Sequence, residues 1–129
     1  SLRLFKSYLP QLEHGEQKRD FVYIKDVVDI MLYLMKNPRL EASGIYNVGT
    51  GQARSFKDLG TAIFQAMDKK PHFQWIDMPD SIRNQYQNFT QAEMDRFRKM
   101  TGYNKPFMTL EASINDYYRN YLMGELRYL

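Results

Sequence analysis

Short apolar runs alternate along this chain with longer stretches in which apolar residues recur every three or four positions. The short runs predict strands, because strands are short and rich in β-branched and aromatic residues. The strands that we expect are a short or edge strand around Leu2–Phe5, followed by Phe21–Ile24, Ile45–Val48 and Phe73–Ile76. Strands that alternate with helices indicate an α/β fold.

The longest apolar stretch predicts a helix from Val27 to about Lys36, ended by Asn37 and Pro38. Asp26 is placed to cap its first turn, since a carboxylate accepts hydrogen bonds from the free backbone N–H groups there. The stretch is apolar on nearly every side, which is typical of a helix packed between two layers. We therefore expect this helix to be sandwiched rather than to lie on a surface.

Three further helices are predicted, and the residues that open them are Ser55, Thr90 and Thr109. Asp58 and Glu93 follow the first two by three positions, which is the spacing of a capping box. Behind each opening residue, apolar positions recur as one helix face requires. Gly102 fits the C-terminal end of the helix that follows Thr90.

Composition places the chain among soluble globular proteins, with 43% hydrophobic and 26% charged residues. Ten tyrosines and eight phenylalanines can serve as core or as ligand contacts. The net charge of +3 suits an anionic ligand but lacks the basic stripe of a nucleic-acid partner. The apolar stretch around Asp29 is too short to span a membrane.

The absence of cysteine and the wide separation of His14 and His72 exclude a disulfide framework, a thiolate nucleophile and an ordinary zinc site. We therefore expect no metal. A chain without cysteine fits the reducing cytoplasm.

A few short strands separated by helices do not make a self-sufficient parallel sheet of ordinary size. The sequence also opens at Ser1 in mid-pattern, without an initiator methionine. We expect residues 1–129 to form one region of a larger protein, with at least one strand that belongs to a sheet outside the chain. Exposed strand edges favour association, so a homo-oligomer is expected.

No catalytic constellation is present in the sequence. Gly49-Thr50-Gly51 follows a predicted strand, but the third glycine of a dinucleotide-binding fingerprint is replaced by Arg54. A tight turn is the favoured interpretation, and no cofactor-binding residue is assigned. None of the ten tyrosines has a lysine four positions later, so the Tyr-x-x-x-Lys pair of short-chain dehydrogenases is missing as well.

Ligand binding remains the chemistry that the residues support. The planar fork of Arg19 suits a diphosphate, although an ion pair with Asp20 or Asp26 is an alternative. Tyr86 is an aromatic alcohol in a polar loop, where it could bond a phosphate or sugar oxygen or cover the helix after Thr90. Lys6, Ser7 and Tyr8 offer mixed donors in the opening loop, as polar loops commonly do.

Several runs of residues together resemble the ADP-L-glycero-D-manno-heptose 6-epimerases, a family of extended short-chain dehydrogenase/reductases among the NAD-dependent epimerases and dehydratases. The resemblance covers essentially the whole chain. Two runs, Arg19 to Val27 and Ile45 to Gly51, are shared across the superfamily, whereas the runs Tyr86 to Ala92 and Gly102 to Phe107 are more particular to the heptose epimerases.

The resemblance implies an enzyme that converts ADP-D-glycero-D-manno-heptose to its L-glycero epimer by transient oxidation at C6, for lipopolysaccharide core synthesis. It also implies NADP, with NAD possible, bound by an N-terminal Rossmann domain outside the chain. The chain would then be the C-terminal, substrate-binding part, inactive alone, and the strand that ends at Gly49 would belong to the Rossmann sheet.

The same resemblance assigns substrate-binding roles to six residues. Arg19 would bind the diphosphate region and Tyr86 would contact the substrate, while Phe5, Lys6, Ser7 and Tyr8 would form part of a substrate loop. A related enzyme acting on UDP- or dTDP-sugars is the main alternative. A small binding module, for RNA for example, is disfavoured by the interspersed acidic residues.

Overall fold

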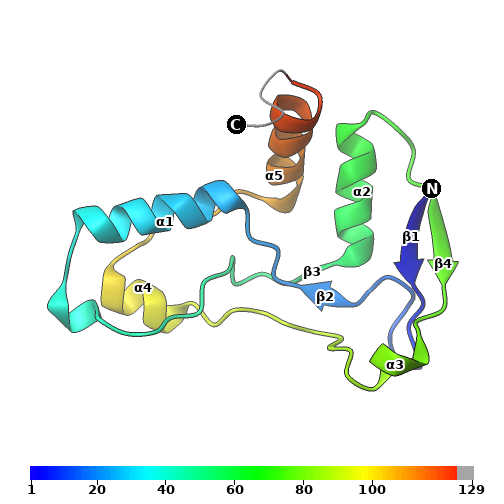
Figure 1. Ribbon diagram of the computed structural model, residues 1–129, viewed down its shortest axis with the longest axis horizontal. Coiled ribbons are helices and arrows are strands. Elements are labelled where there is room, and N and C mark those ends of the chain that lie inside the picture. The colour runs from blue at the N-terminus through cyan, green and yellow to red at the C-terminus, as the bar shows by residue number, and fades with distance from the viewer. Residues whose placement is uncertain (125–129) are drawn as a thin grey trace.

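Two very short sheets contain the strands of this protein, which a computed structural model describes over residues 1–124. β1 (Leu2–Phe5) and β4 (Phe73–Ile76) pair in parallel, with Leu2 opposite Phe73. Helix α2 (Phe56–Ala66) lies beside this pair (Figure 1). A Cβ on Gly60 of α2 would lie 2.6 Å from the Phe73 ring and 2.8 Å from the Leu2 side chain, so the helix needs a glycine there. Both predicted strands are confirmed.

The second sheet joins β2 (Lys18–Arg19) to β3 (Arg54–Ser55) in antiparallel register, with Arg19 opposite Arg54. Lys18 also bridges to Phe89 on its other side. The predicted strand Phe21–Ile24 is therefore wrong, since the pairing lies just before it. Backbone groups make a strand only where a neighbouring segment offers partners, and within residues 1–124 those partners face Lys18 and Arg19.

Helix α1 (Ile24–Lys36) ends where the sequence predicts, with Asn37 at the C-cap, but it begins before Asp26. The expected cap by Asp26 is therefore wrong. Asp26 lies in the first turn, and its carboxylate accepts a hydrogen bond from the backbone N–H of Met108 at 3.0 Å. The residue ties the start of α1 to the segment that leads into the last helix.

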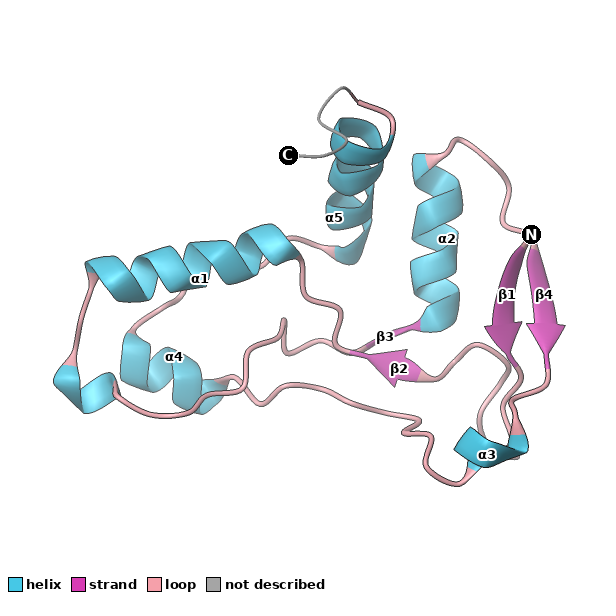
Figure 2. Cartoon of the chain, viewed as in Figure 1, coloured by secondary structure: helices cyan, strands magenta, loops and turns pink. Residues whose placement is uncertain are grey.

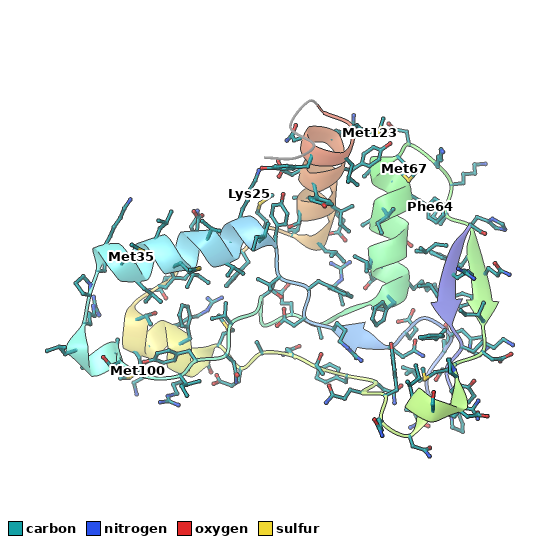
Figure 3. The ribbon with its side chains drawn as sticks, viewed as in Figure 1. Lys25, Met35, Phe64, Met67, Met100 and Met123 are labelled. Atoms are coloured by element: carbon teal, nitrogen blue, oxygen red, sulfur yellow. The ribbon has the colours of Figure 1, made fainter. Side chains whose placement is uncertain are left out.

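One hydrophobic core joins α1 to α4 (Asp95–Thr101), formed by Ile30, Met94, Phe97 and Tyr103. The opposite side of α1 is uncovered: Met31 is 58% exposed and Met35 is 76% exposed. Figure 3 labels Met35 on this side of the helix. Within the described part of the chain, the expectation of a sandwiched helix is therefore not met.

The predicted strand Ile45–Val48 does not form, and Ile45 is 90% exposed. This segment follows the short 3-10 turn η1 (Leu40–Ala42) and runs as irregular chain, as Figure 2 shows. An apolar strand needs a sheet on which to pair. No neighbouring segment among residues 1–124 pairs with it.

Of the two predicted capping boxes, the structure contains one. The capping box of Ser55 and Asp58 is present at the start of α2. The box of Thr90 and Glu93 is wrong, because α4 begins only at Asp95 and has no side-chain cap. The Glu93 carboxylate instead accepts from the backbone N–H of Asp95 at 2.5 Å.

The last helical segments follow the prediction more closely. Gly102 ends α4 with a φ of 74°. Thr109 caps α5 (Leu110–Asp116), which continues as a π-helical segment over Tyr117–Leu122. The remaining helix, α3 (Asp80–Arg83), is a single turn after β4.

Across residues 1–124 every helix is too short or too polar to cross a lipid bilayer. The same residues contain no cluster of three side chains suited to hold a metal ion.

Candidate functional site

Arg19 lies in β2 with its guanidinium beside two aromatic rings. Its Cζ is 5.2 Å from the centroid of Tyr86 and 5.8 Å from that of Phe56, and its Nη1 donates to the carbonyl of Lys18 at 2.8 Å. No carboxylate within residues 1–124 pairs with it, because Asp20 and Asp26 bind backbone amides elsewhere. A guanidinium held by rings rather than by an acid keeps donors for an anion.

Tyr86 and Phe5 complete this group of side chains. Their rings meet edge to face with centroids 6.1 Å apart, and both are half-buried. The loop that carries Tyr86 is fixed by the backbone of Lys18, which donates to Asn88 and accepts from Thr90. The structure thus brings together three of the six predicted site residues, from β1, β2 and the loop after α3.

The other three predicted residues use their polar groups internally. Lys6 forms an ion pair with Asp77 at 3.0 Å, and the hydroxyl of Ser7 exchanges hydrogen bonds with Leu9. The Tyr8 hydroxyl donates to the carbonyl of Met78 at 3.1 Å and accepts from the backbone N–H of Met78 at 2.8 Å. Their contacts hold the opening loop in shape.

Phe56 is a residue that sequence reasoning missed. Its ring lies beside Arg19 and packs edge to face on Phe21, with centroids 5.6 Å apart. The capping box places it as the first residue of α2, but only the pairing of β2 with β3 brings α2 next to Arg19. No local pattern contains that information.

Asp20, next to Arg19, organises the glycine turn. Its carboxylate accepts from the backbone N–H groups of Thr50, Gly51 and Ala92 at 2.7, 2.9 and 3.1 Å, and from the Thr50 hydroxyl at 2.5 Å. Gly49 is required because a Cβ there would lie 2.6 Å from the Asp20 carboxylate. Burial raises the pKa of Asp20, but the hydrogen bonds outweigh burial and leave the pKa below its ordinary value.

The turn at Gly49-Thr50-Gly51 is accordingly structural. A phosphate-binding glycine loop presents free backbone N–H groups to the ligand. Here the amides of Thr50 and Gly51 donate to Asp20 instead. These contacts are those of a tight turn, as the sequence predicts.

Tyr23 is unsuited to act as a general base. Burial and a 2.6 Å hydrogen bond to Asp116 raise the pKa of Tyr23 to about 12, so its hydroxyl stays protonated near neutral pH. Lys25 also contacts Asp116, at 2.7 Å, and the hydrogen bonds from Lys25 and Tyr23 lower the pKa of Asp116 to about 2. These contacts join the start of α1, where Figure 3 labels Lys25, to α5.

Comparison with known proteins finds relatives of this chain among the epimerases. Residues 5–49 match the NAD dependent epimerase/dehydratase family. Two curated relatives named ADP-L-glycero-D-manno-heptose-6-epimerase are each 46% identical, from Nitratidesulfovibrio vulgaris over 94% of the chain and from Fusobacterium nucleatum over 99%. The chain spans 36% and 40% of the lengths of these two proteins.

Solved structures resemble the same part-length region. ADP-L-glycero-D-manno-heptose-6-epimerase of Helicobacter pylori is 31% identical, with a TM-score of 0.69 over 92% of this chain and 32% of that one. UDP-glucose-4-epimerase of Stenotrophomonas maltophila, solved with NAD, is 20% identical with a TM-score of 0.73, over 92% and 34% of the two chains, and shows the fold alone.

The predicted fold class, short strands alternating with helices as in part of an extended short-chain dehydrogenase, is thereby confirmed. By sequence and by fold, the chain is similar to part of the NAD dependent epimerase/dehydratase family and of the ADP-L-glycero-D-manno-heptose-6-epimerases, and it spans about a third of the length of these relatives.

Proposed function

We propose that this chain is the substrate-binding part of a nucleotide-sugar epimerase that converts ADP-D-glycero-D-manno-heptose to ADP-L-glycero-D-manno-heptose. The observation that carries the proposal is Arg19, held beside Tyr86 and Phe56 without a carboxylate partner among residues 1–124. The curated relatives at 46% identity support the choice of an ADP-heptose. The product would serve lipopolysaccharide core synthesis in the cytoplasm.

The role of this chain would be to hold one end of the substrate. Arg19 would bind the diphosphate through its in-plane donors, and Tyr86 would contact a phosphate or sugar oxygen. A firm hold on the nucleotide end lets the sugar end turn over between two orientations without the substrate leaving the enzyme. That division of labour suits a chain without catalytic residues of its own.

The proposed cofactor is NADP, with NAD as the alternative, and the described residues do not fit it. The glycine turn cannot cradle a pyrophosphate, because Asp20 already accepts from its amides. The cofactor would therefore be held by a Rossmann domain outside residues 1–129. A homo-oligomer completes the proposal, because exposed strand edges favour association.

The substrate class is tested by thermal shift on the full-length protein. We expect ADP-heptose to raise the melting temperature more than UDP-sugars or dTDP-sugars do at equal concentration, because a ligand stabilises the folded state more when its dissociation constant is lower. ADP alone and free heptose serve as controls. A larger shift with a UDP- or dTDP-sugar would contradict the ADP-heptose assignment and favour a relative that acts on that nucleotide.

The division of labour predicts that residues 1–129 alone have no epimerase activity, even with NADP added. The reason is that the chain contains no Tyr-x-x-x-Lys pair and no free glycine loop. The assay is product formation from ADP-D-glycero-D-manno-heptose by the isolated chain, with the full-length protein as positive control. Turnover by the isolated chain would contradict the proposal.

A further inference from the structure

Two loops leave the same edge of the small parallel sheet. Because β1 and β4 are parallel, their carboxyl ends lie side by side, and the segments after Phe5 and after Ile76 start next to each other (Figure 1). The first residues beyond the strands, Lys6 and Asp77, form an ion pair at 3.0 Å. The two loops are therefore joined at the first residue after each strand.

A second junction follows a few residues later and is closer. The Arg83 guanidinium carbon lies 3.8 Å from the centroid of the Tyr8 ring. Nη2 of Arg83 donates to the Tyr8 hydroxyl at 3.0 Å and to the carbonyl of Met78 at 3.2 Å, and it pairs with Asp80 at 2.7 Å. Stacking and hydrogen bonding act on one ring at once, which fixes both its position and its rotation.

The contacts of Tyr8 also limit what that residue can do. Its hydroxyl donates to the Met78 carbonyl and accepts from both the Met78 backbone N–H and Arg83. A phenol has one proton to donate and two lone pairs. Its capacity is therefore filled by protein groups, and Tyr8 serves as an anchor for Arg83 rather than as a free ligand contact.

Tyr8 and Arg83 are close in sequence to two residues of the candidate site. Arg83 is the last residue of α3, shortly before Tyr86, whose ring lies 5.2 Å from the Arg19 guanidinium carbon. Tyr8 follows closely on Phe5, whose ring meets that of Tyr86. Fixing Tyr8 against Arg83 thus fixes the two chain segments that carry Phe5 and Tyr86, and Tyr86 lies beside Arg19.

We propose that Arg83 is a positioning residue of the substrate site, which through its stacking on Tyr8 holds Tyr86 beside Arg19 and Phe5 against Tyr86. The inference rests on the proposed function for its effect on substrate. The part of the inference that concerns the contact between the two loops can be tested without any ligand.

The kinetic test compares Arg83→Gln with Arg3→Gln in the full-length enzyme, since Arg3 is an exposed arginine of β1 without a side-chain partner among residues 1–124. We expect Arg83→Gln to raise KM for ADP-heptose roughly five- to tenfold, a modest size because Arg83 is partly exposed. We expect kcat to stay within about twofold, since the lost hold acts on bound substrate and transition state alike. Arg3→Gln should match the wild type.

Two further variants separate positioning from general damage. Arg83→Lys keeps the charge but loses the planar stack, so it should recover only part of the lost affinity. Tyr8→Phe keeps the ring stacked on Arg83 but removes the hydroxyl, which bonds Met78 as well as Arg83. Because the bond between the hydroxyl and Arg83 is lost in both variants, the combined effect of Tyr8→Phe and Arg83→Gln should be smaller than the sum of the two. A KM within twofold of wild type in Arg83→Gln, or fully additive effects, would overturn the proposal.

Hydrogen exchange on the same proteins tests the loop junction itself. In Arg83→Gln we expect faster amide exchange in residues 6–9 and 84–88, with α1 and α2 unchanged. Unchanged exchange in both loops would overturn the inference even if the enzyme is an epimerase. A wild-type protein that turns over no nucleotide sugar would contradict the proposed function. It would also contradict the substrate role of Arg83. Hydrogen exchange would still decide whether Arg83 joins the two loops.

Discussion

Arg19→Ala in the full-length protein is expected to weaken binding of ADP-heptose about 100-fold, the size expected for loss of a bidentate, charge-assisted contact to a diphosphate. The measurement is titration calorimetry with the nucleotide sugar. The effect should be large because, among residues 1–124, Arg19 is the cation that lies over the rings of Tyr86 and Phe56. Arg19→Lys should recover little, since an ammonium lacks the planar fork.

The matched control for that experiment is Lys18→Ala. Lys18 is the neighbouring cation of the same two-residue strand, is exposed, and forms no ion pair among residues 1–124. Its loss removes the same unit charge from the same neighbourhood without touching the aromatic rings. Equal affinities for wild type and Arg19→Ala, or equal losses in the two variants, would remove Arg19 from the site.

The second large effect is on stability. Asp20→Asn is expected to lower the free energy of unfolding by about 2 kcal/mol, a value that allows for partial solvent exposure of the carboxylate. Asparagine keeps one acceptor oxygen but turns an NH2 group toward backbone N–H donors that now lack a partner. Urea unfolding of the full-length protein measures the change, and Glu13→Gln, an exposed acid without a side-chain partner among residues 1–124, is the control.

The pH dependence of this difference has a definite sign. Because hydrogen bonds lower the folded-state pKa of Asp20 below its ordinary value of 3.8, ionised Asp20 stabilises the fold fully above that pH. The advantage over Asp20→Asn should begin to shrink near pH 3.8 and vanish as the pH falls through the lowered pKa. A difference that is independent of pH from 7 down to full protonation would contradict the role given to the carboxylate.

The local parts of the fold were predictable from the sequence. Ser55 with Asp58 and Thr109 all act on residues within one helical turn, and the structure confirms them. Thr90 with Glu93 has the same spacing, yet no helix starts there, because Thr90 donates its backbone N–H to Lys18 in the second sheet. A contact from a distant segment outweighed a local preference.

The non-local parts could not be predicted in this way. The run Ile45–Val48 is apolar as a buried strand requires, but a strand depends on neighbours, and none pairs with it among residues 1–124. The uncovered side of α1 has the same origin. Both features agree with relatives that are about three times as long as this chain.

The candidate site divides along the same line. Arg19, Tyr86 and Phe5 were predicted through the resemblance, and they do lie together. The other three predicted residues bind partners within the protein, and no sequence pattern predicts those partners. They are Lys6, Ser7 and Tyr8. Phe56 was missed because its neighbour Arg19 is reached only by strand pairing.

The pairing of Leu2 with Phe73 has a consequence for the order in which the chain folds. The two strands are far apart in sequence, so their pairing must close a long loop of chain. The entropic cost of closing that loop makes formation of this sheet slow. The hydrogen bonds and the capping box of helix α2 join residues close in sequence, so this helix can begin to form earlier. Its glycine-lined face at Gly60, which meets both Phe73 and Leu2, then offers a surface on which the two strands can find each other. A side chain at that position would slow the search as well as weaken the result.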